Sequence, residues 1–316
     1  MADIHILFEN DAWMAPLREA LTDRGLTWTE HFTDGGTLDL TQAPPEGIWI
    51  NRMSPSSHTR GHQGGVVFVG AFLHHLEAHG RRVINGSNAF ALEVSKVRQD
   101  LALRRAGIST PKTLAVIGDM EALKSAARTF DGPFITKHNQ GGKGLGVKLF
   151  EDLEAFDAHV DSDEFILSPD GVMLLQQYIK PAEPFVTRVE IVGDRLQYAI
   201  RASTEDGFEL CPAAECDAGT GFCPVGGTGK FTRDTTLTQD DPLVQSYLRL
   251  MEQQGIDLAG IEFVTDADGH RITYDINGTT NYNADVEAQH GLNGMGSLAD
   301  LVVREVQSRR HRAAAK

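Results

Sequence analysis

The chain has 316 residues, 41% of them hydrophobic, which is enough for two or three compact units. Its 44 Asp and Glu residues outnumber 29 Lys and Arg, and the net charge of −15 argues against a general nucleic-acid binder. No apolar run approaches the roughly 20 residues of a membrane span, and the first residues lack the pattern of a signal peptide, so we expect a cytoplasmic protein.

The first third of the chain alternates apolar strands with amphipathic helices. We predict strands at residues 3–8, 47–51 and 82–85, and helices at residues 13–24 and 67–79. This alternation indicates a parallel α/β sheet. We therefore assign residues 1–94 to an N-terminal α/β domain.

A polar loop at residues 52–65 follows the second of these strands. It carries Arg52, His58, Arg60 and His62 at the carboxyl end of a strand, where open α/β sheets place their ligands. The loop predicts a site for an anionic substrate. A surface loop with incidental charge is the alternative.

From residue 95 the chain changes character. We predict helices at residues 94–106, 120–130 and 151–160, and strands at residues 112–117, 134–137, 147–150 and 173–178. A glycine-rich loop at residues 139–146 joins two of these strands, so it fits neither a Walker A loop nor a Rossmann turn. Such a loop can lie over a polyphosphate, with Lys137 as a point charge beside it, or act only as a flexible linker.

The last part of the chain mixes clear elements with an irregular segment. Strands are predicted at residues 187–192 and 196–202, and helices at residues 243–254 and from residue 297. Residues 203–233 are too irregular to assign and contain Cys211, Cys216 and Cys223. Their spacing fits no zinc pattern and their number is odd, so we expect unpaired thiols, with a redox or metal role as the alternative.

Residues 259–281 predict a hairpin that carries three oxygen ligands. Two β-branched runs flank Asp268-Gly269, a strong signal for a type I′ turn, and folding about it sets Glu262 opposite Asp275. Asn277 points to the same face. Two adjacent carboxylates repel each other unless a cation lies between them, and hard oxygen ligands suit Mg²⁺. The alternative is a solvent-exposed polar face.

Separate motifs in a fixed order resemble the ATP-grasp superfamily, and within it the RimK-like and LysX-like amino-acid ligases. They are Lys96, PFITKHNQGGKGLGV, LLQQYI, RVEIVGDRLQYAIR, GIEF and YDIN, and they cover about residues 85–285. The resemblance implies an α/β ATP-grasp fold, with a small parallel-sheet N-terminal domain and two α+β subdomains that enclose ATP. These would be residues 95–180, with the glycine-rich loop, and residues 181–316, with the metal ligands.

The resemblance also implies which residues contact the nucleotide. Lysines would contact the phosphates, the glycine-rich loop would close over them, and the end of LLQQYI would hold adenine. Relatives often have an Asp for the ribose where Val186 stands, and Glu183 would replace it. The expected nucleotide contacts are Lys96, Lys137, Gly141, Gly142, Gly144, Gln176, Gln177, Tyr178, Ile179 and Glu183.

The implied reaction is ATP-dependent amide formation through an acylphosphate. Positioning and charge neutralisation would do the catalytic work. The expected cofactors are ATP and two Mg²⁺ ions, with Mn²⁺ as an alternative metal, and the family's metal ligands match Glu262, Asp275 and Asn277. Arg201, Arg188 and Lys143 are the expected catalytic residues, although each arginine could instead form a salt bridge, and Arg52 and Asn281 are the expected substrate contacts.

The sequence leaves the substrates and partners open. We expect a carboxylate and an amine, as small molecules or peptides, and neither a nucleic acid nor a membrane partner. A homodimer follows only from the resemblance, and a carrier-protein substrate stays open. An ATP-grasp phosphotransferase and a non-catalytic nucleotide-binding module are the alternative functions.

Overall fold

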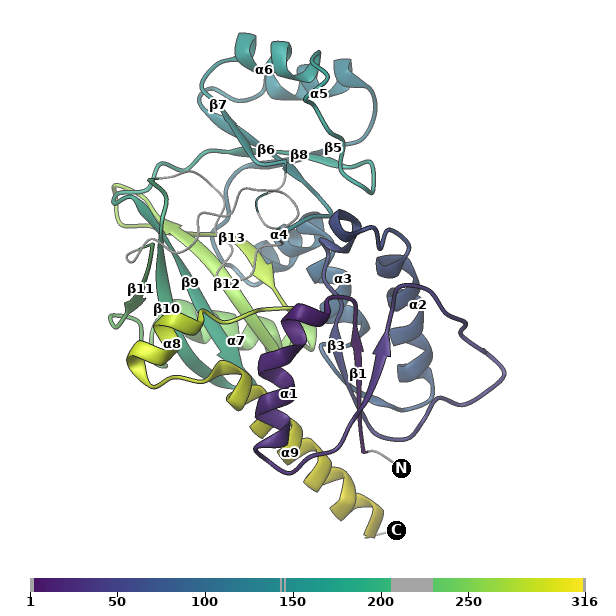
Figure 1. Ribbon diagram of the computed structural model, residues 1–316. Helices are drawn as coiled ribbons and strands as arrows, with labels where there is room; N and C mark the ends of the chain where they lie inside the picture. The colour runs from purple at the N-terminus through teal and green to yellow at the C-terminus, as the bar shows by residue number, and fades with distance from the viewer. Residues whose placement is uncertain (1–2, 143, 145, 206–229, 315–316) are drawn as a thin grey trace.

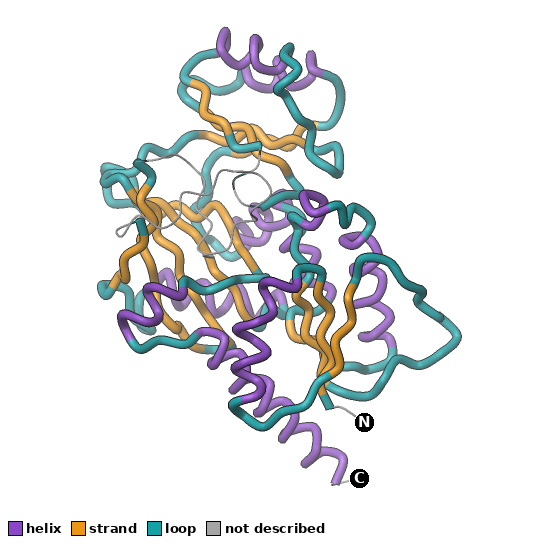
Figure 2. Tube along the Cα trace, in the orientation of Figure 1, coloured by secondary structure: helices purple, strands orange, loops and turns teal. Residues whose placement is uncertain are grey.

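Three β-sheets organise the chain in the computed structural model, which describes residues 3–142, 144, 146–205 and 230–314. A parallel sheet near the N-terminus is followed by a small and then a larger antiparallel sheet (Figure 1). Helices cover the small sheet on the side away from the larger one (Figure 2). The chain thus has the mixed α/β architecture that the sequence predicts.

The N-terminal sheet has the strand order β2-β1-β3-β4, with every strand parallel to its neighbour. Alternate residues of its first strand face opposite cores, Ile4 and Ile6 on one side and Leu7 on the other. Our prediction omits β2, whose four residues, TEHF, are not buried. The elements are β1 (Ile4–Phe8), a 3₁₀ helix (Asp11–Met14), α1 (Ala15–Thr22), β2 (Thr29–Phe32), β3 (Ile48–Arg52), a 3₁₀ helix (Ser57–Arg60), α2 (Gly65–Ala78), β4 (Arg82–Ile84) and α3 (Ser87–Glu93).

The small antiparallel sheet has the order β5-β8-β6-β7 and packs against two short helices. Three aromatic rings, those of Phe134, Phe150 and Phe156, fill the space between sheet and helices with centroids 5.1–5.8 Å apart. Asp119 and Asp152 cap the two helices by accepting from backbone N–H groups in the first turn. The elements are β5 (Thr113–Val116), α5 (Met120–Ala127), β6 (Phe134–His138), β7 (Lys148–Phe150), α6 (Leu153–Val160) and β8 (Met173–Gln177).

The larger antiparallel sheet has the order β11-β10-β9-β12-β13. One of its faces packs against α4 and α7, and the other packs partly against α9. Our prediction omits α3, β11 and α8, and it begins α4 at residue 94, whereas Ser95 is the N-cap of this helix. The elements are α4 (Lys96–Arg105), β9 (Phe185–Val192), β10 (Arg195–Ser203), β11 (Phe231–Asp234), α7 (Pro242–Gln254), β12 (Leu258–Thr265), β13 (Arg271–Asn277), α8 (Ala284–His290) and α9 (Gly294–Ala314).

Apolar cores cross the predicted domain boundaries. Leu103 of α4 packs in the core of the larger sheet, and Val302 of α9 packs against the N-terminal sheet. The division at residues 94 and 180 therefore stays a prediction. Within the described ranges, no helix combines the length and the apolar character needed to cross a membrane.

Candidate active site

A cleft lies between the small sheet, the larger sheet and the loop that follows β3. It contains about 1430 Å³ of space not filled by atoms, part of it open to solvent. Its lining comes from β6, β8, β9, β12 and β13, from the start of α4 and from residues 54–56. Residues from distant parts of the chain therefore meet in this one cleft.

The β12–β13 hairpin sets Glu262 directly opposite Asp275, as the sequence predicts. Its turn is longer than the predicted two-residue type I′ turn. The N–H of Gly269 donates to the carbonyl of Asp266, and Gly269 itself has a φ of 82°. This is a type I turn followed by a left-handed glycine, which is typical of three-residue hairpin loops.

The longer turn shifts the strand pairing by one residue, so that Thr265 lies opposite Arg271 instead of the predicted Ile272. A shift of one residue would carry every later side chain to the other face of the sheet. A bulge at Tyr274 supplies the extra residue and restores the predicted pairing beyond it. The side chains of Glu262 and Asp275 both face the cleft because the longer turn and the bulge shift the register by one residue in opposite directions.

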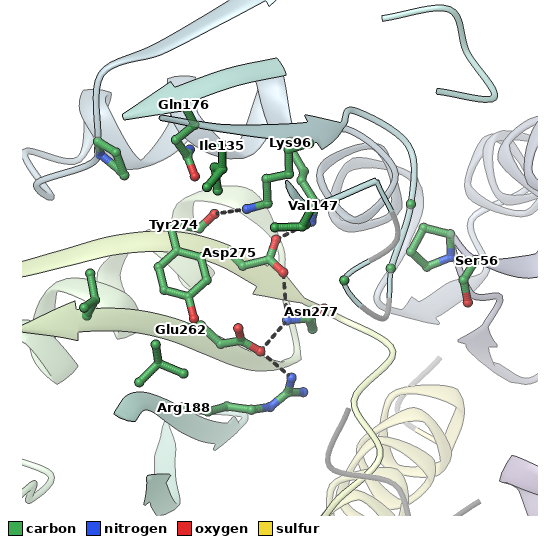
Figure 3. Close-up of a pocket in the computed structure, with 18 of the residues that line it drawn as sticks. Ser56, Lys96, Ile135, Val147, Gln176, Arg188, Glu262, Tyr274, Asp275 and Asn277 are labelled. Atoms are coloured by element: carbon green, nitrogen blue, oxygen red, sulfur yellow. Dashed lines mark hydrogen bonds and ion pairs between the residues drawn. The ribbon is translucent and has the colours of Figure 1, made fainter. Parts of the chain in front are cut away.

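Glu262, Asp275 and Asn277 lie next to one another in the cleft (Figure 3). The amide nitrogen of Asn277 is 3.3 Å from Glu262 Oε1 and 3.5 Å from Asp275 Oδ2. A positive group, the partial charge of an amide N–H, therefore stands between the two carboxylates. A half-turn of this amide would present its oxygen instead, and the three residues would then offer only hard oxygen ligands.

Two lysines neutralise Asp275 from the other side. Lys96, at the first position of α4, forms an ion pair with Asp275, and Lys137 donates to the Tyr274 carbonyl at 3.2 Å. Burial alone would raise the pKa of Asp275, but Lys96 and Lys137 outweigh burial and hold that pKa below its ordinary value. Burial lowers the pKa of Lys137 to about 8, although Asp275 acts against this. The lysines can thus serve as counter-charges for an anion in the cleft.

Arg188 lines the cleft but is engaged by protein groups. Its guanidinium donates to Glu190 at 2.6 Å, to Glu262 at 2.8 Å and to the Thr280 hydroxyl at 2.7 Å. Burial raises the pKa of Glu262, although Arg188 acts against this. Without Arg188, the buried charge of Glu262 would be left uncompensated. Arg188 therefore stabilises the Glu262 carboxylate in its position at the cleft.

The end of β8 forms another part of the cleft wall. Gln176 donates to the Thr113 hydroxyl at 2.9 Å, and the backbone N–H of Tyr178 donates to the Pro133 carbonyl at 3.0 Å. Ile179 packs against Val186 and other apolar residues of the larger sheet. All four residues predicted to hold adenine, residues 176–179, line the cleft.

The glycine-rich loop follows β6 and borders the cleft through Gly141, Gly142 and Gly144. Gly146 has a φ of 73° and lies against the buried ring of His138, where a Cβ atom would come within 2.4 Å of the ring. Only glycine therefore fits this position without a shift of the loop or the ring. Lys143, an expected catalytic residue, lies outside the described residues.

Arg201 does not line the cleft, contrary to its predicted role. A strict hairpin about residues 193–194 would set Arg201 opposite Val186, which does line the cleft. A bulge at residue 197 instead sets Arg201 opposite Thr187, on the other face of the sheet, where Arg201 donates to Asp234 at 2.9 Å. Glu183 is also outside the cleft lining and is exposed, so its predicted ribose contact gains no support.

The predicted substrate residues divide between the lining and the layer behind it. Asn281 lines the cleft, whereas Arg52 is buried behind it and donates to Asn281. Arg60 and His62 pair with the buried Glu9, so they are not free to bind an anion.

The predicted loop at residues 52–65 contributes Ser54, Pro55 and Ser56 to the lining. Other lining residues were not singled out from the sequence: Trp13, Glu93, Tyr274 and Thr279. The place of Tyr274 in the lining depends on the bulge at this residue, which the sequence does not reveal. Glu93 accepts backbone N–H groups of Gly278 and Thr279, a contact between residues far apart in the sequence.

Comparisons with known proteins show what the chain resembles. The model of the RimK-like ATP-grasp domain matches residues 94–211. A probable alpha-L-glutamate ligase of Mannheimia succiniciproducens is 28% identical over 197 residues, which are 62% of this chain and 60% of that protein. Beta-citrylglutamate synthase B of Danio rerio is 25% identical over 75% of this chain and 54% of that protein. The matches thus span less than two thirds of the length of these relatives.

Solved structures share the fold over nearly the whole chain. The ATP-grasp ligase PsnB, complexed with a minimal precursor, has a TM-score of 0.67 at 19% identity and covers 96% of this chain and 99% of its own. D-alanyl-alanine synthetase A from Vibrio cholerae has a TM-score of 0.65 at 14% identity and covers 96% of this chain and 98% of its own. Residues 94–211 thus resemble the RimK-like ATP-grasp domain, and the chain as a whole shares the fold of solved ATP-grasp ligases.

Proposed function

We propose that the protein is an ATP-dependent carboxylate–amine ligase. One observation carries the proposal: a single cleft brings together the end of β8, the glycine-rich loop, two lysines and the Glu262–Asp275–Asn277 set. Each comes from a different segment of the chain. A module that only bound a nucleotide would need fewer of these groups.

The reaction has two steps. An oxygen of the substrate carboxylate attacks the γ-phosphorus of ATP, and the bond to the β–γ bridging oxygen breaks, which gives an acylphosphate and ADP. The amine then attacks the acyl carbon, loses a proton and displaces inorganic phosphate, which leaves the amide. No protein nucleophile is needed, so the protein acts by orienting the reactants and balancing charge.

The residues present fit Mg²⁺. Two carboxylates and one amide lie on adjacent positions, and the amide N–H of Asn277 now occupies the space between the acids. Glu262, Asp275 and Asn277 would hold the metal, and Mg²⁺ would neutralise phosphate charge. The number of ions, two in our proposal, and the use of Mn²⁺ in place of Mg²⁺ belong to the same proposal.

The nucleotide contacts follow from the positions of the lining residues. Backbone groups of residues 176–179 would read the adenine edge, and Ile179 would pack on its face. Lys96 and Lys137 would contact the phosphates, under the glycine-rich loop with Lys143. Arg188 would hold Glu262 in place rather than contact the phosphate that is transferred.

The names of the relatives guide the choice of substrates. A glutamate ligase, a citrylglutamate synthase and ribosomal protein bS6–L-glutamate ligases are among them. We therefore propose L-glutamate as the first amine to test, with a peptide end or a small carboxylic acid as the other substrate. A homodimer and a carrier-protein substrate stay outside this proposal.

Measuring ADP release together with product masses tests the function. The protein, Mg²⁺ and ATP are incubated with pairs of amino acids, dipeptides and small carboxylic acids, each pair including L-glutamate or lacking it. ADP release that requires both substrates, with a product mass equal to their sum minus water, supports the ligase. A product that gains one phosphate and forms no amide would replace the ligase with a phosphotransferase.

A further inference from the structure

Arg52 is a buried cation, and no carboxylate among the described residues forms an ion pair with it. It ends β3, is 4% exposed, and donates to two neutral oxygens, the Thr280 carbonyl at 3.0 Å and Asn281 Oδ1 at 2.7 Å. Its Nε is buried and has no hydrogen-bond partner in the structure. Burial lowers the pKa of Arg52 to about 10, although Tyr282 and Glu93 act against this. Arg188, the buried arginine that lines the cleft, is by contrast ion-paired.

The contact with Arg52 fixes the orientation of the Asn281 amide. Because Oδ1 accepts from the guanidinium, the NH₂ group is the end of the amide left for the cleft, which Asn281 lines. Nδ2 has no hydrogen-bond partner among the described residues. The amide therefore offers two donors to the cleft, and a positive charge lies directly behind them.

Among the described residues of the lining, Glu93 is the carboxylate near the wall that contains Asn281. Thr279 holds the loop after β3 by donating to the Met53 carbonyl at 2.9 Å, which brings Ser54 and Ser56 beside residues 279–281. Glu93, the acid nearest to this wall in the cleft lining, is engaged by two backbone N–H groups. Donors and a buried positive charge suit an anion, not an ammonium group.

We propose that Arg52 and Asn281 form a subsite for a carboxylate group of the substrate. Asn281 makes the direct contact through Nδ2, and Arg52 is a positioning residue that fixes the amide and supplies the compensating charge. This inference rests on the proposed function, which is what makes the bound carboxylate part of a substrate. It does not rest on turnover, because binding of a carboxylate can be measured separately.

The test measures melting temperatures of the protein saturated with Mg²⁺ and AMPPNP. Sodium acetate, glutarate and L-glutamate are compared with sodium chloride at equal ionic strength. Asn281→Asp keeps the size of the side chain, still accepts from Arg52 and presents an acceptor in place of the NH₂ group. Asn88→Asp adds the same charge on α3, outside the cleft, where Asn88 bonds only Gln254, and serves as the matched control.

We expect at least one carboxylate to raise the melting temperature beyond chloride. The apparent affinity for it should fall by roughly tenfold or more in Asn281→Asp and stay unchanged in Asn88→Asp, since a donor is replaced by a like charge. Arg52→Met should weaken carboxylate binding, and Arg52→Lys, which keeps the charge, should recover part of it. If Arg52→Met fails to fold, Asn281→Asp alone decides.

Three results would overturn the proposal. The carboxylates could fail to stabilise the wild-type protein beyond chloride. Their effect could persist undiminished in Asn281→Asp. The affinity for AMPPNP could fall in Asn281→Asp, which would assign the subsite to a nucleotide phosphate. Carboxylate binding without amide formation would instead refute the ligase and leave the subsite standing.

Discussion

Replacing Gly146 with alanine tests whether the conformation of the glycine-rich loop depends on the close contact between Gly146 and the His138 ring. The new Cβ would lie 2.4 Å from the His138 ring, which is buried and whose Nε2 bonds the Ile166 carbonyl at 2.9 Å. Neither the ring nor the backbone can move freely. A non-glycine residue with a φ near 73° costs about 1–2 kcal/mol, and overpacking adds about 1–3 kcal/mol.

Gly171 is a matched control for the backbone part of this cost. It has a φ of 74°, and a Cβ atom there would meet nothing within 4 Å. Gly171→Ala should therefore lose only the ~1–2 kcal/mol of the backbone. The difference between the two variants measures the contact with His138.

Urea unfolding and titration with Mg²⁺ and ADP measure the two effects. We expect Gly146→Ala to unfold more easily than Gly171→Ala or, where the loop yields instead, to bind the nucleotide at least ~10-fold more weakly, as ~1.4 kcal/mol implies. The double variant His138→Ala, Gly146→Ala should recover part of the loss. If Gly146→Ala and Gly171→Ala behave alike in both assays, the loop does not depend on His138.

Other variants test separate parts of the account. Asp275→Asn should reduce ATP turnover by about 100-fold or more, as measured by ADP release, since it removes the counter-charge of two lysines and a proposed metal ligand; near-normal turnover would refute the metal assignment. Asn139 accepts from the N–H of Val97 at the start of α4 and donates to Asp170. Asn139→Asp should therefore weaken nucleotide binding in a titration, and adding Asp170→Asn should restore the binding by relieving the repulsion between the two acids. If the second substitution restores nothing, the contact between Asn139 and Asp170 does not support nucleotide binding. Arg201→Met should retain turnover within about threefold, as measured by ADP release, because this arginine lies outside the cleft lining; a large loss of turnover would return it to the active site.

The sequence predicted the pairing of Glu262 with Asp275 through an incorrect turn. The turn signal Asp268-Gly269 suits both a two-residue and a three-residue loop, and these differ by one residue in register. The bulge at Tyr274 hides this error, since it adds one residue back. The shared position of Glu262, Asp275 and Asn277 was predictable because polar residues in strand patterns are unusual, whereas bulges leave no clear signal in a single sequence.

The same kind of bulge explains why Arg201 lies outside the cleft lining. Hydrophobic alternation could not locate the extra residue at position 197, and that residue decides which face Arg201 occupies. Arg52 illustrates another limit. Its role depends on Asn281, 229 positions away in the sequence, and only the packing of the N-terminal sheet on the C-terminal segment brings the two together.

The transfer of oxygen from the carboxylate to phosphate tests the proposed chemistry most directly. The carboxylic acid that supports ADP release is labelled with ¹⁸O in both carboxyl oxygens, and the released phosphate and the amide are analysed by mass spectrometry. Activation through an acylphosphate predicts one ¹⁸O in the phosphate and one in the amide. Unlabelled phosphate, or label found in AMP, would contradict the account.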